Sequence, residues 1–277
     1  MAKSRRSVRR GAAAARAARE SRTGLLKIAG VIALVAVVGG AYFAVARGNQ
    51  ALDKETLCPA KPSAVTVLLV DVTDPMTTAQ KQDFRNQLNR LRNAVPRYGK
   101  LIVTKVDSSS AELLQPVIVR CNPGTAADVS AWNGDPKTVQ KAHDSGFIAD
   151  LDEAFESLSR ARPSDRSPIF ESVQSVALTE LASPEVSDLP RKLVLVSDLL
   201  QNTDAVSFYG GLPSPEALIG SAPFRRVRTD LGGVEVEIWM LERLDAARTQ
   251  PRTLIDLWDA AINAQGGSVV RAYNVSG

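Results

Sequence analysis

The stretch that decides the fold is residues 64–77, Ala-Val-Thr-Val-Leu-Leu-Val-Asp-Val-Thr-Asp-Pro-Met-Thr. Its first seven residues are almost wholly apolar or β-branched, which is typical of a strand buried on both faces of a parallel sheet. The apolar run ends at Asp71, so a polar turn follows the carboxyl end of this strand. In open α/β sheets ligands bind at that edge, because its loops are held by a rigid scaffold.

Side chains that carry oxygen are crowded into this turn. Asp71, Thr73 and Asp74 fall within four residues, and Thr77 lies just beyond them. Carboxylate and hydroxyl oxygens of this kind suit hard cations and phosphoryl groups. The turn is therefore the first candidate site in the chain.

A second segment of the same kind lies at residues 191–198, Arg-Lys-Leu-Val-Leu-Val-Ser-Asp. Its apolar centre predicts another buried strand, and it also ends in polar residues, Ser197 and Asp198. Because the carboxyl ends of parallel strands meet at one edge of a sheet, we expect Asp71 and Asp198 to lie close together.

Together the two segments resemble the von Willebrand factor A (vWA) family, in which Asp-x-Ser-x-Ser follows the first strand and an Asp follows the fourth. The resemblance covers residues 63–277 and implies an α/β fold, with a doubly wound, mostly parallel, Rossmann-like sheet of about six strands. In that family these residues and a Thr from a mid-chain loop chelate Mg²⁺ as a metal-ion-dependent adhesion site. Carried to this sequence, the resemblance implies as metal ligands Asp71, Thr73, Ser167 and Asp198.

Pro75 departs from the family pattern, because its side chain has no oxygen. Two alternatives follow for the site. In one, Mg²⁺ offers an open coordination position to a carboxylate of a partner; in the other, the same edge is a metal-free scaffold. Ser167 also has an alternative role, because Ser167 followed by Pro168 predicts the N-cap of a helix over residues 167–181.

The loop after Asp198 is polar and is expected at the same edge. We call this edge the rim, and define it as residues 71–77, Ser167 and residues 197–204. We expect the rim to bind an unidentified protein partner. The candidate contact residues are Asp74, Thr77, Ser197, Gln201, Asn202 and Asp204.

The amino-terminal part of the chain has the pattern of a membrane anchor. Residues 1–27 hold nine Lys or Arg against one acid, a local charge of +8 in a chain of net charge +4. Residues 28–46 form a run of nineteen residues without a charge. At about 1.5 Å per residue, a helix of that length matches the hydrocarbon core of a bilayer, so we predict one transmembrane helix.

The charge distribution predicts the orientation of this anchor. The positive-inside rule places the tail at 1–27 in the cytoplasm and residues 63–277 in the periplasm or outside the cell. We expect the tail to contact lipid headgroups and not nucleic acid, because no base-reading motif accompanies its charge. Residues 47–62 are expected to be a tether, and the protein is expected in a bacterial inner membrane as an uncleaved single-pass protein.

The two cysteines, Cys58 and Cys121, are expected to form a disulfide, since the predicted location is outside the cytosol. The bond would join the tether to the domain.

Hydrophobic periodicity predicts the remaining elements. Helices are expected over residues 77–95, 138–160, 167–181 and 251–264, and further strands over residues 100–106, 117–120, 233–240 and 268–272. Their alternation predicts a single domain with right-handed parallel crossovers.

Composition excludes several enzyme classes. The only histidine, His143, lies in a polar stretch where we expect a solvated surface position and not a catalytic base. Clusters of histidine ligands are impossible, and no glycine-rich phosphate loop follows a predicted strand. We therefore predict a protein that is not an enzyme and has no small-molecule substrate.

One enzymatic alternative remains open. Residues 71–77 also resemble the Asp-x-Thr-x-x-x-Thr turn of haloacid-dehalogenase-type phosphotransferases. That resemblance implies Asp71 as a nucleophile assisted by Mg²⁺ and Ser197 as a strand-end hydroxyl. Against it, no later strand ends in the paired acids that would hold the metal.

Overall fold

The computed structural model describes residues 27–41, 51–106, 108, 113–129, 134–158, 164–243 and 250–275. The chain divides into two compact units, residues 1–50 with 132–134, and the remainder. In the first unit, residues 27–41 form a helix. Within the residues described, none of the helices is both long and apolar enough to span a membrane. The predicted basic tail, apart from Lys27, and residues 42–46 of the predicted span lie outside the described residues.

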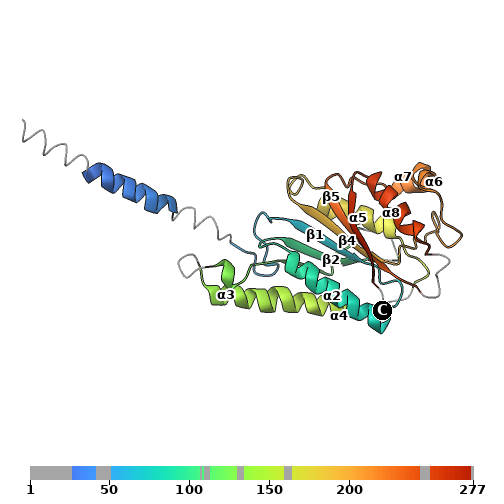
Figure 1. Ribbon diagram of the computed structural model, residues 1–277, viewed down its shortest axis with the longest axis horizontal. Coiled ribbons are helices and arrows are strands. Elements are labelled where there is room, and N and C mark those ends of the chain that lie inside the picture. Colours follow the sequence, from blue (N-terminus) through green and yellow to red (C-terminus); the bar gives the residue numbers. More distant parts are fainter. Residues whose placement is uncertain are drawn as a thin grey trace, which may run out of the picture. The chain divides into compact units, whose positions relative to one another are not determined.

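The second unit is built on a six-stranded sheet in the order β3-β2-β1-β4-β5-β6 (Figure 1). All neighbouring strands are parallel except β2 and β3. The doubly wound, mostly parallel sheet predicted from the sequence is therefore confirmed. The strands are β1 (Val65–Val70), β2 (Lys100–Lys105), β3 (Ile118–Cys121), β4 (Arg191–Ser197), β5 (Val234–Leu241) and β6 (Ser268–Val275).

Helices cover both faces of this sheet (Figure 1). Helices α2 (Thr78–Ala94) and α4 (Ala149–Leu158) pack on one face, and α5 (Ile169–Val176) and α8 (Thr253–Asn263) pack on the other. Because β1 turns alternate side chains to opposite faces, Leu68 and Val70 join the first core while Val67 and Leu69 join the second. The burial of all six β1 residues explains its continuous apolar sequence.

Two regions differ from the helices expected from periodicity. The predicted helix at 138–160 is α3 (Pro136–Lys141), a π-helical segment (Ala142–Ile148) and α4 in succession. Two short helices, α6 (Pro215–Gly220) and α7 (Ala222–Val227), were not predicted. Each has only six residues, too few to show a helical period, although each is capped by a serine side chain.

The predicted disulfide between Cys58 and Cys121 is confirmed. It fastens the segment before β1 to the last residue of β3, and the backbone N–H of Cys121 donates to the carbonyl of Thr56 at 2.9 Å. Residues 51–62, expected to be tether, thus belong to the folded unit and are joined to the end of β3 at Cys121.

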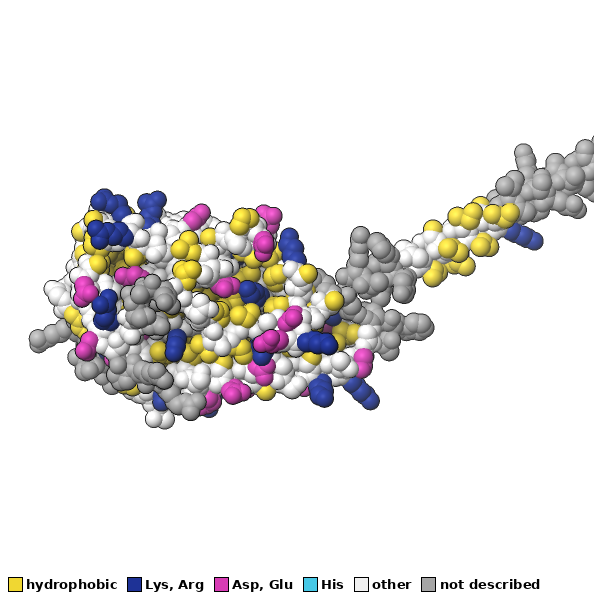
Figure 2. Space-filling view, turned by 180° about the vertical axis from the view of Figure 1, so that it is seen from behind, with side chains coloured by type: hydrophobic (Ala, Val, Ile, Leu, Met, Phe, Trp, Pro, Cys, Tyr) yellow, Lys and Arg dark blue, Asp and Glu magenta, His cyan; other side chains and the backbone are white. Residues whose placement is uncertain are grey.

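The surface of the folded unit carries both signs of charge. Figure 2 shows acidic and basic side chains interspersed over the face it draws, with basic side chains gathered where α6 and α7 lie. Arg225 and Arg226 in the last turn of α7 are both exposed.

Candidate functional site

The rim lies where the order of strands reverses, between the adjacent strands β1 and β4. In doubly wound sheets this switch point is where loops diverge to opposite faces and leave a crevice. The backbone N–H of Asp71 donates to the carbonyl of Val196 at 2.7 Å, so β1 and β4 stay paired up to their ends. Asp71 and Asp198 thus emerge at one edge of the sheet, as predicted.

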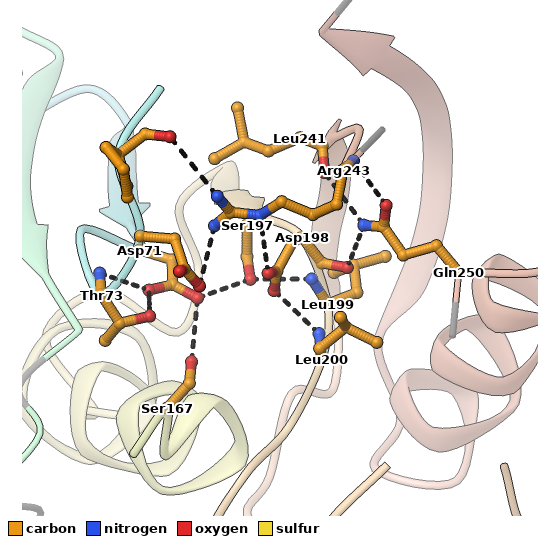
Figure 3. Close-up of polar contacts among 12 residues, drawn as sticks. Asp71, Thr73, Ser167, Ser197, Asp198, Leu199, Leu200, Leu241, Arg243 and Gln250 are labelled. Carbon is orange, nitrogen blue, oxygen red and sulfur yellow. Dashed lines mark hydrogen bonds and ion pairs between the residues drawn. The ribbon is translucent and has the colours of Figure 1, made fainter. Parts of the chain in front are cut away.

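Asp71 is the centre of a buried hydrogen-bond cluster (Figure 3). Its Oδ1 accepts from the backbone N–H and the hydroxyl of Thr73, at 3.0 and 2.6 Å. Its Oδ2 accepts from the hydroxyls of Ser167 and Ser197, at 2.9 and 2.8 Å. A carboxylate has about four lone-pair sites, and here four donors use them. The carboxylate of Asp71 is 3% exposed and fully satisfied within the protein.

Asp198 is equally buried but is satisfied differently. Its Oδ1 accepts from the backbone N–H of Leu200 at 3.0 Å, and its Oδ2 accepts from Nε of Arg243 at 3.0 Å. A second nitrogen of Arg243 lies 2.9 Å from Oδ2 of Asp74. The guanidinium therefore bridges the loop after β1 and the loop after β4 (Figure 3).

The loop after β4 is held in an unusual conformation at Leu199, whose φ is 64°, in the left-handed region that glycine favours. Hydrogen bonds on both sides of the residue fix it there. The N–H of Leu199 donates to Oγ of Ser197 at 2.9 Å, and its carbonyl accepts from Nε1 of Trp258 at 3.0 Å. The side chain of Gln250 donates to the carbonyls of Asp198 and Leu241. The loop is thus rigidly positioned from α8 and from the end of β5.

The predicted capping role of Ser167 is wrong. The N-cap residue of α5 is Pro168 and not Ser167. No side chain forms a capping hydrogen bond at this N-cap. The hydroxyl of Ser167 is directed to Asp71, and its backbone pairs with Asn202 through two hydrogen bonds of 2.9 Å. Gln201 satisfies the helix start instead, because its Oε1 accepts from the N–H of Phe170 at 2.9 Å.

The other predicted rim residues lie in different surroundings. Thr77 and Gln80 form a capping box at the start of α2. Gln201 is 1% exposed and also donates to Glu171. Asp204 is largely exposed and pairs with Arg166 at 2.9 Å. Of these residues, Asp204 presents its side chain to solvent, whereas Thr77 and Gln201 support the loops.

Three residues that sequence reasoning missed belong to this region: Arg243, Gln250 and Tyr209. Tyr209 is 51% exposed, and burial and then the charges of Asp198 and Asp74 raise its pKa. It is therefore an exposed aromatic side chain near the carboxylates of the rim. The loop sequence Phe-Tyr-Gly-Gly did not distinguish it, because the neighbouring Phe208 is fully buried in the core.

The residues of the rim do not fit a divalent cation in this arrangement. Asp71 has no free acceptor site, Pro75 contributes no side-chain oxygen, and Arg243 brings a positive charge onto Asp198. Among the described residues, His, Cys, Asp and Glu form no group of three that could hold a metal ion. Coordination of Mg²⁺ by the four predicted ligands would require Asp71 to exchange hydrogen bonds and Arg243 to withdraw.

The phosphotransferase alternative finds no support in the geometry. It needs acidic residues at the end of a later strand beside Asp71, but Arg243, the last residue described after β5 before the gap at 244–249, brings a cation to Asp198 and Asp74. Asp71 itself is enclosed by four donors and is 3% exposed, which leaves no open direction for attack on a phosphoryl group.

The electrostatics of the rim predict a pH dependence of stability. Burial, and then the charge of Asp71, raise the pKa of Asp198 from 3.8 to about 6, while the N–H of Leu200 and Arg243 oppose the rise. Because the pKa is raised in the folded state, the contribution of Asp198 to stability is fully present below 3.8 and is lost as the pH rises through about 6.

We expect the stability advantage of the wild type over Asp198→Asn to fall by about 2 kcal/mol between about pH 4.5 and about pH 7.5. Urea denaturation of both proteins across this range measures it. If the free energies of unfolding of the two proteins changed with pH in parallel, the assignment of the raised pKa to Asp198 would be contradicted.

The chain is similar to solved structures, but not detectably similar in sequence to a protein family or a curated protein. No family model and no curated protein matches the chain. Solved structures that it resembles include the VWA domain of SpRpn10, with 12% identity, 77% of this chain and 89% of that chain covered, and a TM-score of 0.38. BatB from Bacteroides thetaiotaomicron, a conserved hypothetical protein, has 10% identity, coverages of 76% and 91%, and a TM-score of 0.42. An aerotolerance-related membrane protein from Bacteroides fragilis has 10% identity, coverages of 76% and 92%, and a TM-score of 0.40. Similarity this distant does not extend to function, partners or metal content.

Proposed function

We propose that this protein is a membrane-anchored, extracytoplasmic protein-binding module of vWA-like architecture, which contacts its partner through the rim. The observation that carries the proposal is an exposed aromatic side chain, Tyr209, on loops that a buried hydrogen-bond cluster holds rigid. Tyrosine is enriched where protein interfaces concentrate their binding energy, and a preformed rim lowers the entropy lost on binding. Asp204 and Arg166 add exposed charges of both signs.

The proposed location has separate support. The charge of +8 on residues 1–27, followed by nineteen uncharged residues, is the pattern of a single-pass anchor with a cytoplasmic amino terminus. The Cys58–Cys121 disulfide agrees with an oxidising compartment for the folded unit.

Capture of binding proteins from membranes tests the partner role. The solubilised full-length protein is compared with Tyr209→Ala, which changes an exposed side chain and is expected to weaken binding by at least about 10-fold. Leu178→Ala is the matched control, because Leu178 is 57% exposed and lies in the segment that follows α5 away from the rim. Equal recovery of partners by all three proteins would reject the rim as the binding surface.

Labelling tests the orientation. A membrane-impermeant thiol reagent is applied to spheroplasts that express Ser187→Cys or Ser7→Cys, since the native cysteines are paired. Ser187 is exposed on the folded unit, so Ser187→Cys is expected to react without permeabilisation and Ser7→Cys only after it. The opposite pattern would place the folded unit in the cytosol.

A further inference from the structure

The positive charge beside the rim carboxylates Asp74 and Asp198 is a side chain, Arg243. We propose that Arg243 is a built-in counter-cation, which takes the place that a divalent ion has in the family that the sequence resembles and allows the rim to assemble without metal. This inference goes beyond the proposed binding function and does not depend on any partner.

The contacts of Arg243 carry the proposal. Its Nε lies 3.0 Å from Asp198, another nitrogen lies 2.9 Å from Asp74, and a third is 3.4 Å from the carbonyl of Pro75 (Figure 3). The side chain of Arg243 is 17% exposed and that of Asp198 is 3% exposed. One guanidinium therefore neutralises a buried carboxylate and links the loops after β1 and β4 to the end of β5.

The position of Arg243 is itself fixed. Its backbone N–H donates to Oε1 of Gln250 at 2.6 Å, and the amide of Gln250 donates to the carbonyls of Asp198 and Leu241. The planar fork of arginine suits two acceptors at once, which a flexible lysine does not match. Gln250 thus acts as a positioning residue that directs the guanidinium to the carboxylates.

Pro75 points to the same conclusion from the other side of the site. At this position the family pattern has a hydroxyl that would contribute an oxygen to a metal. Here the side chain contributes none, and the residue's carbonyl instead faces the guanidinium. The site thus has one side-chain oxygen fewer than the family pattern, and a cation of the chain itself lies on Asp198.

Arg243 and a divalent ion would compete for the same oxygen. Oδ2 of Asp198 already accepts from Nε of Arg243, and a cation beside it would be repelled by the guanidinium. Removal of Arg243 would leave Asp198 as a buried carboxylate without a counter-charge, which is strongly destabilising and is also the condition that favours metal binding.

Thermal melting of the detergent-solubilised full-length protein, with and without about 10 mM Mg²⁺, tests the proposal. We expect no Mg²⁺ response in the wild type. Arg243→Ala is expected to melt about 10 °C lower and to recover part of that loss when Mg²⁺ is added. Arg166→Ala is the matched control, because it removes an exposed arginine paired with a rim carboxylate, and it should show neither effect.

Each other outcome contradicts the proposal. A saturable rise in the melting temperature of the wild type with Mg²⁺ would show that metal binds despite Arg243. If Mg²⁺ did not restore any of the melting temperature lost in Arg243→Ala, Arg243 would be only a member of a structural ion pair. If Arg243→Ala does not fold, Arg243→Ala combined with Asp198→Asn should fold, since it removes both charges, and its failure would also count against the proposal. None of these results bears on whether Tyr209 contacts a partner.

Discussion

Replacement of Trp258 by alanine is expected to lower the free energy of unfolding by about 4 kcal/mol. Trp258 is 1% exposed and stacks on Phe170 with ring centroids 4.2 Å apart. Its indole also donates to the carbonyl of Leu199, so the substitution leaves a cavity and removes one of the two hydrogen bonds to that carbonyl, the other coming from the N–H of Gln201 at 3.1 Å. The loss of this hydrogen bond should release Leu199 from its left-handed conformation and disorder the loop after β4.

Two control variants separate packing from the effect on the rim. Trp258→Phe keeps most of the ring but loses the hydrogen bond, and should cost about 1 kcal/mol, because the carbonyl of Leu199 still accepts from the N–H of Gln201. Trp239→Ala creates a comparable cavity on the opposite face of the sheet, where Trp239 packs against Phe84. Urea denaturation followed by circular dichroism measures the stabilities, and partner capture reports on the rim. If Trp239→Ala impaired capture as severely as Trp258→Ala, the effect would be one of global stability and not of the loop.

Loss of the Cys58–Cys121 disulfide is expected to lower the free energy of unfolding by about 4 kcal/mol, because the bond closes a long loop in the unfolded chain. The two cysteines are 63 positions apart. The native state should keep its sheet, since Cys121 is also held by the ladder between β2 and β3 and by its hydrogen bond to Thr56.

The double variant Cys58→Ser with Cys121→Ser is suited to this measurement, because either single variant would leave a reactive thiol. Its urea midpoint should match that of the wild type in reductant and fall well below that of the oxidised wild type. The same reductant should not shift the midpoint of the double variant, which has no disulfide to lose. Equal midpoints for oxidised and reduced wild type would mean that the bond does not constrain the unfolded chain.

The strands and the site at their ends could be predicted because their signal is local. In β1 and β4 a continuous apolar run stops at a polar residue, and a parallel sheet then brings the two ends together wherever they lie in the sequence. The disulfide followed from the presence of two cysteines together with the predicted location outside the cytosol. Short helices such as α6 escaped prediction because six residues do not complete two turns.

The parts of the site that could not be predicted depend on tertiary contacts. Arg243 follows β5, and nothing in its local sequence indicates that its guanidinium reaches Asp74, which lies far away in the chain. Ser167 followed by Pro168 has the local pattern of a helix cap, but Asp71 accepts its hydroxyl and Gln201 replaces it at the helix start. In both cases a buried carboxylate takes the donor, Asp198 from Arg243 and Asp71 from Ser167, because a buried charge left without donors is costly.

The disulfide also determines where mechanical load enters the folded unit. A force that pulls on the chain from before residue 51 would detach residues 51–57 and then stop at Cys58, because the covalent bond passes the tension directly to Cys121 at the end of β3. From there it would act across the hydrogen-bonded ladder between β3 and β2. Load from that side would thus enter the sheet at its edge strand β3 as well as through the segment from Cys58 to β1, the strand that Asp71 follows.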